Sequence, residues 1–213
     1  MRQLANNFTA AFPVFPSIPF DGSCNIEEPK NFNTNNFQRI ELTGFAGFAF
    51  PHELASGTSS FASVAKHTGV MTLDCDGIVM FEKNGQKYML FCELKSSYVK
   101  DDIVHAKDQL VGSSVKMKGL LSTLQGYNRD EYKYIGLIVS FEPTQEQLAS
   151  YGKLTDRGAS FVIRLNHDKR YLMPAANCNT YFHPLAVDDF NIYYVPVPNR
   201  QTTFSVDINT IIQ

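Results

Sequence analysis

The sequence lacks the features that mark secreted, zinc-binding and membrane-spanning proteins. Its four cysteines are scattered through 213 residues with no C-x-x-C pair and no histidine cluster beside them, so neither a disulfide framework nor a zinc site is indicated. Three prolines interrupt the first twenty residues, so a signal-peptide core is absent, and no apolar run reaches about 18 residues. We therefore expect a cytoplasmic protein with no membrane segment.

An excess of positive charge is also absent. The formal net charge is -2 and the pI is near 6.2, which argues against a protein that coats nucleic acid through bulk charge. Any contact with a polyanion must depend on a local patch. An enzyme in which a divalent metal offsets phosphate charge needs fewer basic residues, so this composition does not exclude a nuclease.

The composition that is present indicates one folded domain. Hydrophobic residues make up 44% of the chain and charged residues 19%, which is typical of globular proteins. We expect residues 1–213 to form a single domain, with an irregular N-terminal arm at 1–38, a core at about 50–142 and a C-terminal extension at 143–213. The arm is predicted to be irregular because Asn, Pro and Phe dominate it without a helical period.

Hydrophobic periodicity predicts a hairpin followed by alternating helices and strands. Two β-rich runs flank Asn84-Gly85, which is the strongest short-range signal for a hairpin. The other expected elements are strands at 37–42, 132–141, 161–165, 171–173, 192–197 and 203–206, and helices at 51–67, 99–124 and 143–154. This order favours an α/β fold, a mixed central sheet flanked by helices with extra C-terminal strands.

The hairpin turn determines which charged residues face each other. A two-residue turn at Asn84-Gly85 places Asp76 opposite Glu93 and Asp74 opposite Lys95. Because strand side chains alternate with period two, these four groups project from the same face. The sequence therefore predicts a small cluster of ionisable groups at one end of the hairpin.

Such a cluster has the composition of a metal site. Directly opposed Asp76 and Glu93 have Cβ atoms roughly 4.5 to 5.5 Å apart, so they need a cation between them. Mg²⁺, with Mn²⁺ as a substitute, suits two converging carboxylates, and Lys95 could contact a scissile phosphate or orient the attacking water. For Asp74 we favour an ion pair with Lys95 over metal binding. The alternative for the whole cluster is a set of solvated ion pairs worth about 0 to 1 kcal/mol each.

The run LDCDGIVMF, then YMLFCELKSS, then a helix containing AKDQL, resembles the PD-(D/E)XK nuclease superfamily, which includes restriction endonucleases and RecB-like nucleases. The resemblance covers residues 70–141 and implies a restriction endonuclease-like core. It implies that Asp76 and Glu93 bind metal and that Lys95 is catalytic. Gln109 matches the glutamine on the following helix of RecB-like members, where it would contact substrate or the metal-bound water.

The sequence departs from the family pattern at two points. Cys75 stands before the first carboxylate where the family pattern has proline. The family's upstream helical glutamate has no clear match, and the candidates are Glu53 and then Glu41.

The resemblance implies a metal-dependent enzyme that hydrolyses phosphodiester bonds. We expect DNA as substrate in preference to RNA. We expect endonucleolytic rather than exonucleolytic cleavage, because no second domain for threading is evident. Two alternatives stay open: a non-catalytic binding or assembly module with a nuclease fold, in a defence or nucleic-acid-processing complex, and an unrelated α/β interaction protein whose ion pairs are structural. A homodimer, or an ATPase or sensor subunit as partner, is compatible with a nuclease of this size.

Overall fold

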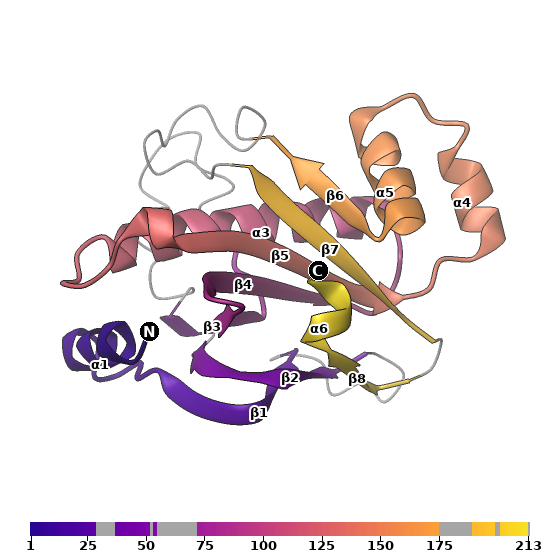
Figure 1. Cartoon of the computed structure of the whole chain (residues 1–213). Coiled ribbons are helices and arrows are strands. Elements are labelled where there is room, and N and C mark those ends of the chain that lie inside the picture. The colour runs from indigo at the N-terminus through magenta and orange to yellow at the C-terminus, as the bar shows by residue number, and fades with distance from the viewer. Residues whose placement is uncertain (29–36, 52, 55–71, 175–188, 199–200, 213) are drawn as a thin grey trace.

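A computed structural model describes residues 1–28, 37–51, 53–54, 72–174, 189–198 and 201–212. Within these residues, one mixed open sheet of eight strands has the order β1-β2-β3-β4-β5-β7-β6, with β8 paired to β2. Figure 1 shows that α3 runs along one face of this sheet and that α4 and α5 lie together at one end. The expected α/β class, a mixed sheet flanked by helices, is confirmed.

The elements follow one another along the chain as follows. The first part contains α1 (Arg2–Ala11), β1 (Ile18–Glu27), β2 (Arg39–Phe50), β3 (Gly77–Lys83) and β4 (Gln86–Lys95). The middle part contains α3 (Lys100–Leu121), the short 3-10 helix η2 (Arg129–Glu131), β5 (Tyr132–Phe141), α4 (Gln145–Tyr151) and α5 (Arg157–Asp168). The last part contains β6 (Arg170–Met173), β7 (Phe190–Val197), β8 (Thr203–Asp207) and α6 (Ile208–Ile211).

The predicted hairpin and its register are confirmed. Strands β3 and β4 pair antiparallel, from Gly77 opposite Cys92 to the residues beside the turn. Asn84 and Gly85 both have positive φ, 51° and 76°, which the favoured two-residue hairpin turn requires. On its other side, β4 pairs parallel with β5, so the hairpin lies inside the sheet.

Apolar side chains cover both faces of the hairpin. On the α3 face, Leu110 and Met117 are buried in a core that also contains Met80 and Phe91. Helix α3 packs closely because Gly136 of β5 has no side chain: a Cβ there would lie 2.8 Å from a Leu110 methyl group. The opposite face holds a second core, formed by hairpin residues such as Val79 and Leu90 together with Ile208 of α6.

The N-terminal segment is more regular than the sequence indicated. The prediction of an irregular arm was wrong for α1 and β1. Leu4 and Phe8 of α1 are buried in the α3-face core, and the Phe8 ring meets Phe50 edge to face at 4.8 Å. Strand β1 pairs antiparallel with β2 along one sheet edge. The predicted strand at 37–42 corresponds to the start of the longer β2.

The predictions after the hairpin are confirmed except for one element. The strand predicted at 161–165 was wrong, because these residues lie in α5. The Asp156 side chain accepts a hydrogen bond from the Ala159 N–H and caps this helix, and Val162 and Leu165 are buried on one of its faces. A short apolar run does not distinguish a helix from a strand by periodicity alone.

The C-terminal residues are part of the sheet and not an appendage. Strand β7 pairs parallel with β5 in the interior of the sheet, and β8 pairs parallel with β2. The helix predicted at 51–67 lies mostly outside the described residues, which include only residues 53–54 of it as helical. None of the helices in the described ranges is long and apolar enough to cross a membrane.

Candidate active site

The predicted charged residues meet at the carboxyl end of β4, on the face covered by α3. Asp76 directly precedes β3, and the hairpin register brings it beside Glu93 of β4. The two residues are joined through the backbone, because the Leu94 N–H donates to Asp76 Oδ2 at 2.7 Å. Lys95 ends the same strand, and Gln109 lies on the helix above it.

Lys95 connects the hairpin to α3. Its ammonium donates to Glu93 Oε1 at 2.6 Å and to Gln109 Oε1 at 2.9 Å. The Gln109 amide nitrogen in turn donates to the Asp74 carbonyl at 2.7 Å. Because Leu110 and Met117 pack against the sheet, α3 presents Gln109 to the charged groups, as predicted.

Glu93 is the most deeply buried charged residue of the cluster, with 1% of its surface exposed. One of its carboxylate oxygens pairs with Lys95. The other, Oε2, is buried and has no hydrogen-bond partner in the described structure. An unpartnered buried polar atom is costly, on the order of 1 to 3 kcal/mol and more when charged. This oxygen therefore has an unused capacity to bind a cation or a proton.

The pKa values of the two carboxyl groups also indicate that this site can bind a cation or a proton. Burial raises the pKa of Asp76 well above its usual value, and the charges of Glu93 and Glu28 raise it further. Burial also raises the pKa of Glu93 to about 7, although the Lys95 ammonium and the Asp76 backbone N–H oppose the rise. Both shifts mean that the doubly ionised pair lacks sufficient positive charge. A divalent cation would supply that charge.

Glu28 is a site residue that sequence reasoning missed. It directly follows β1 and, together with Asp76, lines a cavity of about 420 Å³. Its negative charge raises the pKa of both Asp76 and Glu93. No local pattern marks Glu28, since it reaches the site only through the pairing of β1 with β2.

The two glutamates considered from the sequence lie elsewhere. Glu41 lies on β2 and lines a different cavity, together with Arg39 and Ser205. Glu53 is exposed and does not line the cavity that contains Asp76. The structure therefore brings neither of them to the carboxylate pair.

Asp74 does not form the expected ion pair with Lys95. It pairs instead with Lys116 of α3, whose ammonium also donates to the Leu73 carbonyl at 2.9 Å. The next residue, Cys75, donates its backbone N–H to Ser113 Oγ at 2.9 Å. These hydrogen bonds and the ion pair hold the segment before Asp76 against α3. For this reason Asp74 pairs with the helix and not with Lys95 of β4.

The donor set at this site is small. Among the residues that the structure describes, no group of three or more His, Cys, Asp or Glu side chains lies close enough to hold a metal. Asp76 and Glu93 nevertheless fit a hard divalent ion, because the buried Glu93 Oε2 has no other partner and such ions retain several waters.

Comparisons with protein-family models, with curated proteins and with solved structures found no match for this chain. A functional assignment must therefore depend on the geometry of the site.

Proposed function

We propose that this protein is a metal-dependent nuclease of the PD-(D/E)XK kind that hydrolyses phosphodiester bonds. The observation that carries the proposal is the buried Asp76–Glu93 pair, with one Glu93 oxygen unpartnered and Lys95 hydrogen-bonded beside it. The hairpin, the helix α3 and the parallel strand β5 surround this pair, and this arrangement supports a restriction endonuclease-like core.

Each residue of the cluster has a separate role in the proposed reaction. Asp76 and Glu93 would hold Mg²⁺, with Mn²⁺ as a substitute, and Glu28 would add negative charge at the edge of the site. When bound, the metal offsets phosphate charge and lowers the pKa of a coordinated water. Lys95 holds a positive charge where the scissile phosphate would approach, and it adds no metal ligand. Gln109 positions the Lys95 ammonium through their hydrogen bond.

The proposed substrate is DNA in preference to RNA, cleaved endonucleolytically. Cys24, Cys75 and Cys92 are free thiols, in keeping with a cytoplasmic protein. The proposed function is compatible with a second copy of the chain, or an ATPase or sensor subunit, as partner.

A non-catalytic binding or assembly module is the second candidate, and one observation favours it. Lys95 already forms an ion pair with Glu93, and this pair could be purely structural. In that case the protein would keep a nuclease-like core without binding metal. Metal affinity and turnover therefore distinguish the two functions.

The deciding experiment is digestion of plasmid and linear DNA with Mg²⁺, Mn²⁺ or EDTA, beside calorimetric titration with each metal. Asp76→Ala and Glu93→Ala should lose metal binding and cleavage together, whereas Glu146→Ala, an exposed position on α4, should retain both. A wild-type protein that binds no divalent metal, or that cleaves DNA and RNA no faster than Asp76→Ala, would refute the nuclease proposal and favour the assembly module.

A further inference from the structure

Asp76, the first carboxylate of the candidate site, lies beyond the paired part of its strand. Strand β3 pairs with β4 from Gly77 onward and with β2 from Ile78 onward, so the ladders on both sides begin after Asp76. The Asp76 side chain accepts a hydrogen bond from the Leu94 N–H. This bond holds the carboxylate, and the backbone that leads to it is held by different contacts.

Those contacts come from polar side chains of α3, which reach the segment 73–75 directly before Asp76. Gln109, Ser113 and Lys116 are spaced by four and three residues, so they lie on one face of the helix. We refer to the contacts of Ser113 and Lys116 with residues 73–75 as the α3 clamp. The contacts are Gln109 Nε2 to the Asp74 carbonyl at 2.7 Å, the Cys75 N–H to Ser113 Oγ at 2.9 Å, Lys116 Nζ to the Leu73 carbonyl at 2.9 Å, and the Lys116–Asp74 ion pair.

The α3 clamp is buried, and a buried ion pair is a weak source of stability. Ser113 is fully buried, and Lys116 has 6% of its surface exposed. Apolar residues of similar volume often stabilise a fold as well as a buried ion pair does, because the charges lose their hydration. Overall stability therefore does not account for the presence of Lys116 here. What its contacts do specify is the position of residues 73–75.

We propose that Ser113 and Lys116 are positioning residues that hold Asp76 beside Glu93. They act through the backbone of residues 73–75, which leads directly to Asp76. Without the clamp, the Asp76 carboxylate would sample positions outside the reach of an ion shared with Glu93. The consequence for metal binding rests on the proposed function, whereas the placement of Asp76 is a property of the metal-free protein.

Native-state hydrogen exchange of the Leu94 amide in EDTA measures this placement, because the amide donates to Asp76 Oδ2. Ser113→Ala should increase its exchange rate about tenfold, the effect of weakening one hydrogen bond of ordinary strength. Ser114→Ala is the matched control, since Ser114 is buried on the same helix and its hydroxyl donates to the Val111 carbonyl within α3. In this control the Leu94 amide should exchange as in wild type.

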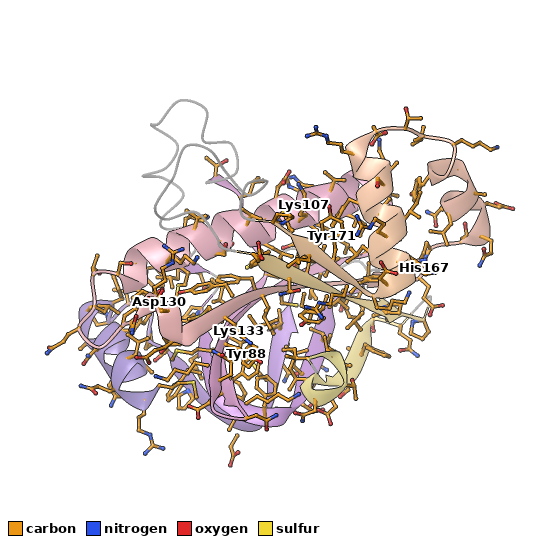
Figure 2. All side chains as sticks on the ribbon, turned by 45° about the horizontal axis from the view of Figure 1, so that its top comes forward. Tyr88, Lys107, Asp130, Lys133, His167 and Tyr171 are labelled. Carbon is orange, nitrogen blue, oxygen red and sulfur yellow. The ribbon has the colours of Figure 1, made fainter. Side chains whose placement is uncertain are left out.

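A second variant removes the ion pair without leaving either charge alone. Lys116→Met combined with Asp74→Asn should accelerate exchange at Leu94 by a similar factor. The matched control is Lys107→Met combined with Asp108→Asn. It removes another ion pair from the same helix, where Figure 2 shows Lys107, and should leave the exchange unchanged.

Calorimetric titration with Mn²⁺ tests the consequence for metal binding. The two clamp variants should bind Mn²⁺ about 10- to 100-fold more weakly than wild type, the range expected when a residue that orients metal ligands is lost. The two control variants should bind it like wild type. A wild-type protein that binds no Mn²⁺ would refute the nuclease proposal and leave the exchange experiment to decide the placement of Asp76.

The Leu137 amide, inside β5, distinguishes positioning from a general loss of stability, because its exchange requires wider opening of the sheet. Faster exchange at Leu94 with an unchanged rate at Leu137 supports the inference, even if the nuclease proposal fails. The inference is overturned if both amides accelerate by the same factor in the clamp variants, or if Leu94 exchanges there as in the controls. It is also overturned if wild type binds Mn²⁺ and the clamp variants bind it equally well.

Discussion

Glu93 should make the metal-free protein less stable as the pH rises. Its pKa increases from 4.5 to about 7, because burial disfavours the charged carboxylate more than Lys95 favours it. Between these pH values the folded protein keeps a proton that the unfolded chain has lost, so the free energy of unfolding falls with increasing pH. A shift of this size corresponds to about 3 kcal/mol. The raised pKa of Asp76 acts in the same direction.

Urea unfolding in EDTA between about pH 5 and about pH 8 measures this effect. Over this pH range the free energy of unfolding should fall by about 3 kcal/mol less for Glu93→Gln than for wild type, because the amide does not titrate. Glu146→Gln, at an exposed position, should follow the wild-type curve. Addition of Mg²⁺ near pH 8 should restore wild-type stability, since a ligand that binds only the folded state stabilises it. Parallel curves for wild type and Glu93→Gln would show that burial of this carboxylate does not control stability.

Substitutions of Lys95, Gln109, Leu110 and Gly47 provide further tests. Lys95→Ala should retain divalent-metal affinity in calorimetry yet reduce DNA cleavage about 100- to 1,000-fold, and equal loss of both would contradict its assigned role. Gln109→Leu should reduce cleavage roughly 10- to 100-fold, with Gln109→Glu less affected because it keeps an acceptor for Lys95, and equal rates in the two variants would argue against positioning. Leu110→Ala should lower the free energy of unfolding by about 2 to 5 kcal/mol in urea, and a loss below about 1 would contradict the packing of α3. Gly47→Ala should cost about 1 to 3 kcal/mol in the same assay, because its Cβ would lie 2.3 Å from the Met80 carbonyl oxygen, and an unchanged midpoint would contradict that close approach.

The hairpin and its charged end could be predicted because the relevant interactions are local. A two-residue turn at Asn84-Gly85 determines the register, and the alternation of side chains then places Asp76 and Glu93 on one face. The three- and four-residue spacing of apolar side chains likewise predicted α3. The choice of Gln109 on that helix came from the family resemblance, and its hydrogen bond to Lys95 places it beside the site. In both cases the structure depends only on residues within one or two neighbouring elements of the sequence.

The sequence by itself therefore determined the α/β class, the hairpin register and the shared face of Asp76, Glu93 and Lys95. Only the tertiary structure decided that Glu28 joins them, because β1 is brought to the site by long-range pairing with β2. It also decided that Asp74 pairs with Lys116, since α3 packs over the segment before β3. Local periodicity contains no information about which distant segments pack together. Contacts between such segments are set by the burial of apolar surface across the whole fold.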